Sequence, residues 1–276
     1  MSQSKQNLLV SIIMPAYNAE KTIEIAIKSL VAQTYPYWEC IVVDDGSADS
    51  TCKILKKMAA ADSRIKLFKH DFNKGRSAAR QKALNNCSGD YVAMLDADDF
   101  YMYNKLEKQI NILQEHTDVE FVSSKMFRFN DFYDTNRTNT NENNVTFYNK
   151  VKGENIKIAH APSLIKRSVL VDFKFDNKLK RAQDYDLMLY LAKNYRFAII
   201  QEELYGYRYD PQNLKNFIKG YYYQALVVKK YSITNFIKII VINFLKVMYR
   251  VVFGSNIIFN KDELINNFIC NLKDGE

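Results

Sequence analysis

Apolar runs and helix-like segments alternate through the first hundred residues of the chain. The apolar runs are short and rich in β-branched residues, which favours buried strands. The segments between them place apolar residues at helical spacing. The predicted strands cover 8–14, 39–47, 64–70 and 90–95, and the predicted helices cover 20–33, 51–61 and 76–87. This order predicts an α/β fold built on a doubly wound, parallel sheet.

Polar residues gather where three of these predicted strands end. They form the clusters 16–18, 44–47 and 96–99. Open α/β sheets bind ligands beyond the carboxyl ends of their strands, because those ends meet at one edge of the sheet. We therefore expect the three clusters to form a single site.

Carboxylates dominate two of these clusters. Asp96, Asp98 and Asp99 follow a predicted strand. Closely spaced carboxylates there can hold a hard divalent cation that bridges a diphosphate. Asp44 and Asp45 can accept a hydrogen bond from a base imide or from a ribose hydroxyl. The ordinary alternatives are a solvated acidic turn for the cluster at 96–99 and an N-capping turn for Asp44 and Asp45. Because both acidic clusters occur at strand ends, a metal site is favoured over a solvated turn.

Three further side chains suit a site for a phosphorylated ligand. Tyr17 can stack on a nucleobase. Arg76, beside Gly75 at the start of a predicted helix, suits an anion or a base edge. Asp184 begins a helix predicted over 183–195 and can act as a general base. The alternatives are a simple strand-to-helix turn at Tyr17 and an exposed basic helix start at Arg76. For Asp184 the alternative is a carboxylate that only complements the helix dipole.

Six sequence motifs occur together over residues 8–210. They are SIIMPAYN at 11–18, LVAQTYP at 30–36, IVVDDGSADST at 41–51, NKGRSAARQKAL at 73–84, GDYVAMLDADD at 89–99 and AQDYDLMLYLA at 182–192. In order and spacing they resemble glycosyltransferase family 2, the inverting nucleotide-sugar enzymes of the GT-A fold. The resemblance implies a Rossmann-like, doubly wound mixed sheet with a C-terminal helical appendage.

The resemblance also implies a role for each matching residue. By resemblance, Tyr17, Asp45 and Arg76 contact the base, with Ala16 and Asp44 nearby. Asp96 faces the ribose, and Asp98 ligates Mn²⁺ or Mg²⁺ under the diphosphate. Asp184 is the catalytic base. The acceptor hydroxyl would then attack the anomeric carbon in line and invert its configuration.

Three positions qualify the resemblance. Gln183 stands where many members carry Glu, and Asp210 stands where a metal-binding His is frequent. Asp210 either replaces that histidine as an oxygen ligand or leaves the metal without a third ligand. His160 either approaches the acceptor or has a structural role.

The implied division of the chain is a catalytic domain and a basic tail. Residues 1–210 form the GT-A domain, with a nucleotide-sugar half at about 8–100 and an acceptor half at about 101–210, and residues 211–276 form a basic, aromatic-rich helical region. The implied activity is transfer from a nucleotide-sugar, a UDP-sugar above all, to a glycan or lipid-linked sugar in surface polysaccharide or lipopolysaccharide synthesis. A non-catalytic nucleotide-sugar-binding or scaffold protein on the same fold is the alternative. A nucleotidyltransferase is disfavoured because PAYN lacks a glycine-rich basic loop.

Composition excludes several other classes of protein. The four cysteines form no CxxC pair, which disfavours zinc and a disulfide framework, and indicates reduced thiols. The first nine residues are polar, so we expect no secretory signal and a cytoplasmic protein. The net charge of +8 allows an anionic partner, but no nucleic-acid-binding motif is present.

Residues 236–253 raise the question of a membrane. Lys238, Lys246 and Arg250 disfavour a spanning helix. With Asn235 and Asn243 they fall in a polar arc about 140° wide at helical spacing. Two hypotheses remain open, an interfacial helix on the anionic inner face of the membrane and a C-terminal helical pair packed on the catalytic domain.

Overall fold

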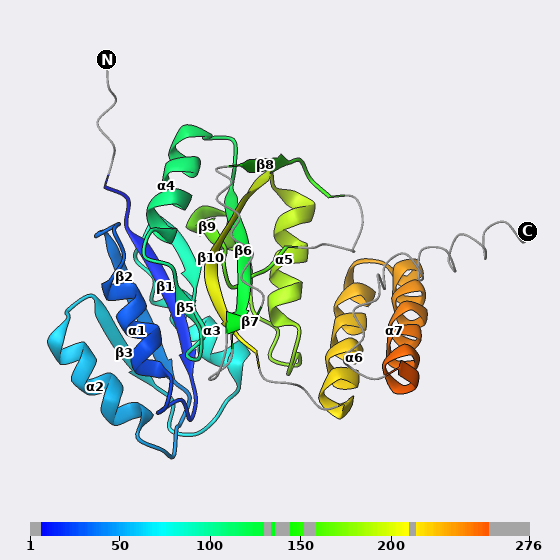
Figure 1. Cartoon of the computed structure of the whole chain (residues 1–276), viewed down its shortest axis with the longest axis horizontal. Helices are drawn as coiled ribbons and strands as arrows, with labels where there is room; N and C mark the ends of the chain where they lie inside the picture. The colour runs from blue at the N-terminus through cyan, green and yellow to red at the C-terminus, as the bar shows by residue number, and fades with distance from the viewer. Residues whose placement is uncertain (1–6, 130–133, 136–143, 152–157, 210–213, 254–276) are drawn as a thin grey trace, which may run out of the picture. The chain divides into compact units, whose positions relative to one another are not determined.

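The computed structural model describes residues 7–129, 134–135, 144–151, 158–209 and 214–253 (Figure 1). The chain divides into two compact units, Met1–Pro211 and Gln212–Glu276.

A mixed sheet forms the centre of the first unit. Its strand order is β3-β2-β1-β4-β9-β6-β10-β5, with β7 beside β6 and β8 beside β10. The first four of these strands are parallel to one another, and β9 runs antiparallel to both β4 and β6. The bounds are β1 Val10–Ala16, β2 Trp38–Asp44, β3 Ile65–Lys69, β4 Tyr91–Met94, β5 Phe100–Tyr101, β6 Phe121–Phe129, β7 Asp134–Thr135, β8 Val145–Tyr148, β9 Leu164–Lys166 and β10 Phe197–Arg208.

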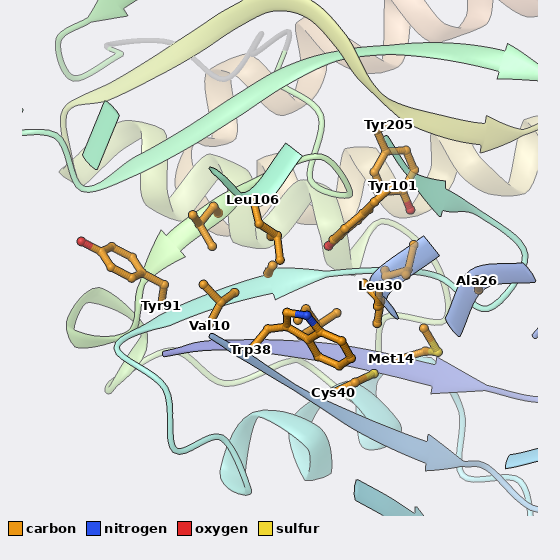
Figure 2. Close-up of a cluster of buried hydrophobic side chains, with 14 of the residues drawn as sticks. Val10, Met14, Ala26, Leu30, Trp38, Cys40, Tyr91, Tyr101, Leu106 and Tyr205 are labelled. Atoms are coloured by element: carbon orange, nitrogen blue, oxygen red, sulfur yellow. The ribbon is translucent and has the colours of Figure 1, made fainter. Parts of the chain in front are cut away.

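Helices cover both faces of this sheet. They are α1 Ile23–Val31, α2 Thr51–Ala61, α3 Arg76–Asn85, α4 Lys105–Glu115 and α5 Gln183–Asn194, with a 3₁₀ turn, η1, at Arg167–Leu170. Neighbouring strand residues point to opposite faces, so Ile12 packs in a cluster with Ile27 of α1. Ile13 packs in the other cluster, with Ala79 of α3 and Leu187 of α5. Figure 2 shows part of the first cluster.

The strands and helices expected in the first hundred residues are all present, so the α/β expectation is confirmed. One difference is that β1 runs past the predicted end at residue 14, through Pro15 to Ala16. Pro15 pairs with Val43 of β2, whereas the pairing with β4 stops at Ile13. Proline is tolerated in a central strand where a neighbouring strand has already ended.

The middle of the chain completes the sheet. The Asn- and Thr-rich segment 130–149 contributes the short strands β7 and β8. Residues 130–133 and 136–143 lie outside the described residues. The long strand β10 pairs in parallel with β6 and in antiparallel fashion with β5 and β8, so it joins the middle of the chain to β5, which directly follows residues 96–99.

The second unit contains α6 Leu214–Tyr231 and α7 Ile233–Phe253, which contact each other. Ser232 lies between them, and its Oγ accepts a hydrogen bond from the Asn235 amide at 3.2 Å, as an N-cap does. The predicted polar arc of α7 does not form an exposed face at Asn243, which is only 6% exposed. Within the described residues, no helix combines the length and the apolar character that crossing a membrane requires.

Candidate active site

The polar clusters predicted from the sequence do come together at one edge of the sheet. Ala16 at the end of β1 pairs with Asp44 at the end of β2, and Asp44 pairs with Lys69 at the end of β3. The acidic residues 96–99 follow β4, which lies on the other side of β1. The carboxyl ends of four parallel strands therefore meet, as the topology of an open α/β sheet requires.

Side chains join the loops that follow β1 and β2. The Asn18 amide donates to Ser47 Oγ at 3.0 Å, and Asn18 Oδ1 accepts from the Ala48 amide at 2.9 Å. Asn18 has a positive φ of 48°, which an Asn tolerates better than most residues. The motif around Tyr17 was singled out from the sequence, but this use of Asn18 was not.

Four described residues have a positive φ, and all lie in loops of this site. Gly46 and Gly75 have φ of 74° and 91°, and Asn18 and Ala182 are the two non-glycine cases. Ala182, with φ of 62°, immediately precedes α5. Sparsely populated backbone conformations tend to gather at functional sites, and here they lie beside the residues predicted from the motifs.

Asp45 is used to hold the loop between β3 and α3. Its Oδ1 lies 2.7 Å from His70 Nδ1 and accepts from the Lys74 amide at 2.9 Å, and its Oδ2 accepts from the Gly75 amide at 2.8 Å. Its own amide donates to the Ala16 carbonyl at 2.8 Å. Asp45 and Ala16, both predicted near the base, are therefore placed at the strand ends, with Asp45 bonded on both carboxylate oxygens.

Asp44 has a different environment. It is completely buried, and its Oδ1 accepts from the Ser47 amide at 3.0 Å. Its Oδ2 is buried and has no hydrogen-bond partner among the described residues. A buried carboxylate oxygen without a donor is costly, so this atom fits a ligand that brings an N–H. Tyr17, at the neighbouring strand end, is 49% exposed and available to stack on such a ligand.

The three carboxylates after β4 have unequal surroundings. Asp96 Oδ1 accepts from Arg80 Nη2 at 2.9 Å, and Asp99 accepts from the hydroxyl of Tyr205 at 2.6 Å. Asp98 is exposed. Burial, together with the charges of Asp96 and Asp98, raises the pKa of Asp99 to about 8. Burial and the neighbouring carboxylates therefore disfavour ionisation of Asp99, the buried member of the loop.

Two arginines of α3 face this loop. Burial alone would raise the pKa of Asp96, but the charges of Arg80 and then Arg76 lower it. Arg80 is buried, whereas Arg76 is exposed at the first position of the helix. The charge of Arg76 thus acts on the acidic loop, while its predicted contact with the base stays a prediction.

Asp184 lies in the first turn of α5 and is exposed. Its charge acts on Arg80 and on His160, which places α5 on the same side of the sheet as the acidic loop. Burial, and then the charge of Arg80, lowers the pKa of His160 to about 4. The buried Nε2 of His160 has no partner among the described residues, and its two possible roles stay open.

The residues present fit a divalent cation that is shared with a ligand. In the part of the chain that the structure describes, no group of three or more metal-binding side chains forms a ready-made cage. Mg²⁺ and similar ions in nucleotide sites use one or two carboxylates together with substrate phosphates. The exposed Asp98 in a negatively charged loop suits that mode of binding. Asp210, the predicted second ligand, lies outside the described residues.

Comparisons with known proteins agree with this geometry. The family model for Glycosyl transferase family 2 matches residues 11–173. An uncharacterised glycosyltransferase of Methanocaldococcus jannaschii is 34% identical over 208 residues, which cover 72% of this chain and 70% of that protein. The Escherichia coli UDP-Glc:alpha-D-GlcNAc-diphosphoundecaprenol beta-1,3-glucosyltransferase WfgD is 50% identical over 105 residues, which cover 38% of this chain and 41% of WfgD.

A solved structure shows the same fold. Residues 1–349 of S. aureus TarS, in complex with UDP-GlcNAc, match with a TM-score of 0.68 at 21% identity, over 94% of this chain and 78% of that one. At that identity the likeness concerns the fold alone. The sheet is that of GT-A glycosyltransferases, the family model spans more than half of the sequence, and the chain belongs to glycosyltransferase family 2.

Proposed function

We propose that the chain transfers a sugar from a UDP-sugar to a hydroxyl of a glycan or lipid-linked sugar, with inversion at the anomeric carbon. The unpaired Oδ2 of Asp44 is the observation that carries the donor assignment. Two names support it: the TarS structure contains UDP-GlcNAc, and WfgD is named for a UDP-Glc donor and a diphosphoundecaprenol-linked acceptor.

The chemistry of the nucleobase explains why Asp44 favours uridine. A carboxylate oxygen only accepts hydrogen bonds. Uracil presents an imide N–H at its ring edge, whereas cytosine presents an unprotonated ring nitrogen at the same position. A cytosine edge would therefore leave Asp44 Oδ2 facing another acceptor, which costs free energy in a buried site.

Exchanging this oxygen for a donor should reverse the preference. In Asp44→Asn, Oδ1 can still accept from the Ser47 amide, while the new NH₂ replaces Oδ2. We expect UDP affinity to fall by about tenfold, the size of a lost hydrogen bond to a charged group, and the ratio of CDP to UDP affinity to rise. Isothermal titration of UDP, CDP and GDP measures both effects, and Asp71→Asn on the exposed loop is the matched control.

An Asp44→Asn protein that binds UDP as tightly as the parent would show that another group reads the base. Tighter GDP than UDP binding by the parent would move the donor to the guanosine class, since guanine also presents a ring N–H.

A divalent cation, Mn²⁺ or Mg²⁺, held by Asp98 would neutralise charge on the departing nucleoside diphosphate. Arg76 and Arg80 of α3 add positive charge at the same loop, and Arg80 fixes Asp96 through its 2.9 Å hydrogen bond. Asp96 retains a second carboxylate oxygen, which is placed to accept from a ribose hydroxyl if the donor lies along the strand ends. Asp210 as a further metal ligand stays part of the proposal.

Asp184 is proposed as the catalytic base. It is exposed, it follows the strained Ala182, and its charge reaches Arg80, which bonds Asp96 at the donor loop. A carboxylate there can take the proton from the acceptor hydroxyl as that oxygen attacks the anomeric carbon from the side opposite the diphosphate. Attack from that side inverts the configuration.

Replacing Asp184 separates catalysis from donor binding. Asp184→Asn keeps size and should lower kcat for sugar transfer by about 10²-fold or more, as loss of a general base does. UDP affinity should change little. The release of UDP measures the rate of transfer, and calorimetric titration measures UDP affinity. A normal kcat with collapsed UDP binding would make Asp184 a donor-binding residue instead.

We also propose that the protein works on the inner face of the cell membrane, as a peripheral cytoplasmic protein. Among the side chains of α7 that the structure describes, those that are exposed are apolar: Ile233 is 71% exposed, Ile237 61%, Ile240 45%, Val241 43% and Phe244 63%. At 100° per residue these five fall within an arc of about 100°, opposite the polar arc. Residues 212–253 contain seven Lys or Arg and no Asp or Glu, so the same unit complements anionic lipid.

A further inference from the structure

Two of the three carboxylates that follow β4 are anchored to the protein from opposite sides. Arg80 of α3 holds Asp96. Asp99, which is 2% exposed, accepts from the Tyr205 hydroxyl at 2.6 Å and from the Arg208 amide at 2.7 Å, both on β10. Arg208 Nε also donates to the Asp98 carbonyl at 3.0 Å. The backbone that carries Asp98 is thus held on both flanks.

Tyr205 connects several points of this loop. Its side chain is fully buried, and its hydroxyl oxygen lies 3.5 Å from the Asp96 amide as well as within bonding distance of Asp99. Its ring packs on that of Tyr101, with centroids 5.6 Å apart (Figure 2). The Tyr101 hydroxyl in turn donates to the Met94 carbonyl at 2.6 Å, where β4 ends. Two tyrosines therefore bond both ends of the loop.

The pairing of β10 with β5 fixes where these tyrosines lie. Tyr205 is opposite Tyr101, and Gly206 is opposite Phe100. A Cβ at Gly206 would come 2.5 Å from the Phe100 ring, so that ring lies directly against Gly206 in this pairing. The backbone pairing therefore fixes where the Tyr205 side chain begins, and burial together with packing on Tyr101 holds its ring.

We propose that Asp99 and Tyr205 are positioning residues, which hold the loop after β4 so that Asp98 meets the cation and the donor diphosphate in one fixed geometry. This inference rests on the proposed role of Asp98. A shift of about 1 Å at a site of this kind can cost about 10²-fold in rate. Neither residue is a catalytic residue, since both act through Asp98.

Removing one hydroxyl tests the proposal. Tyr205→Phe keeps the ring and its packing on Tyr101 while deleting the bond to Asp99. UDP is titrated into each protein with Mn²⁺ and with EDTA. The readout is the UDP affinity in Mn²⁺ divided by the UDP affinity in EDTA. We expect Tyr205→Phe to lower this ratio by about tenfold, with UDP affinity in EDTA unchanged. Tyr35→Phe, which deletes a hydroxyl bonded to the Leu8 carbonyl at the other end of β1, should leave the ratio unchanged.

A mutant cycle separates this inference from the proposed function. If Tyr205 acts through Asp98, adding Tyr205→Phe to Asp98→Ala produces no further loss of the ratio, because interacting sites are not additive. Asp99→Ala, which removes both acceptor oxygens, provides a second probe should Tyr205→Phe fold poorly, and the same loss is expected. If either folded variant has a ratio of UDP affinities within twofold of the parent's ratio, the positioning role is overturned. An unchanged ratio in Asp98→Ala overturns the metal assignment first, and with it the inference.

Discussion

At the scale of single residues, β2 carries a buried carboxylate near each end, and the two differ in their partners. Asp44, at the carboxyl end, has one oxygen without a partner among the described residues. Glu39, near the other end, accepts from Ser11 Oγ at 2.5 Å, from Lys66 Nζ at 2.6 Å and from Ser88. The first is suited to a ligand and the second to stability.

Glu39 makes a prediction about acid stability. Burial alone would raise the pKa of Glu39, but the hydrogen bonds from Lys66, Ser11 and Ser88 outweigh it and lower the pKa to about 2. Because the folded value lies below the unfolded value of about 4.3, the contribution is complete above that pH and is lost as pH falls toward 2. Glu39→Gln should lower the free energy of unfolding at pH 7 by about 1–3 kcal/mol and flatten its decline between pH 4.5 and 2.

Urea denaturation at pH 7, 4 and 3 measures this. Glu24→Gln, which breaks only an exposed pair with Lys28, is the control and should leave stability nearly unchanged, because solvent screens such a pair. Equal pH profiles for Glu39→Gln and the parent would show that the network does not hold an ionised carboxylate.

The base contact illustrates what the sequence could and could not predict at this scale. The Asp44–Asp45 pair was recognisable, because acidic residues ended an apolar run. The sequence does not reveal that Asp45 is bonded by His70 and by amides 29 and 30 residues away, whereas one oxygen of Asp44 has no partner among the described residues. Likewise nothing near Asp99 in the sequence indicates Tyr205, which is 106 residues distant.

At the scale of elements, the loops that follow the strands hold one another in place through their backbones. Gly46 has a φ of 74°, and a Cβ there would come 2.6 Å from the Phe72 carbonyl carbon. Backbone atoms cannot move aside as a flexible side chain can. The loop after β2 therefore requires glycine for its conformation and for its contact with the loop after β3.

Two glycine substitutions separate these requirements. Gly75 also has a positive φ, of 91°, but nothing lies within 4 Å of a Cβ there. Gly75→Ala should cost about 1–3 kcal/mol, the usual range for a strained backbone. Gly46→Ala should cost more, because the clash with Phe72 is added, and it should weaken UDP binding as the loop beside Asp44 shifts. Thermal unfolding and UDP titration of both variants check this order; equal costs would contradict the contact with Phe72.

The elements of the first hundred residues were predictable and those of the middle were not. Local periodicity located β1 to β4 and α1 to α3, and 51–61 coincides with α2. The order β4-β9-β6-β10 arises from antiparallel and parallel pairings between distant segments, which no local pattern reveals. In α7 the helical spacing was visible, but a rule that places polar residues outward does not predict that Asn243 is buried while Ile237 and Phe244 are exposed.

At the scale of the whole molecule, the membrane hypothesis predicts how the chain behaves with lipid. It should sediment with liposomes rich in anionic lipid at low salt and be partly released at high salt. Replacing Ile237 and Phe244 of α7 together with Glu should abolish sedimentation and leave UDP affinity unchanged. Ile25→Glu, at a 52% exposed position of α1, is the matched control and should still sediment.

Other occupants of the α7 face give different results. A second copy of the chain would show as a dimer in size-exclusion chromatography that the double variant dissociates, without liposome binding by the parent. A face packed on the catalytic unit would give neither liposome binding nor a dimer, and the double variant would unfold at a lower temperature than the parent. Sedimentation of the double variant equal to that of the parent would rule out the apolar face as the membrane contact.

The four positive-φ residues of the site limit how this enzyme can be re-engineered. At Gly46, Gly75 and Ala182 the backbone conformation is what the position requires, and at Asn18 it is required together with the side-chain bond to the Ala48 amide. A substitution library over the site should reject β-branched residues at all four, whatever donor or acceptor is used for selection. Variation in donor recognition has to be sought between these fixed points, at exposed side chains such as Tyr17, Phe72 and Arg76, where a new residue changes the contact without changing the path of the chain.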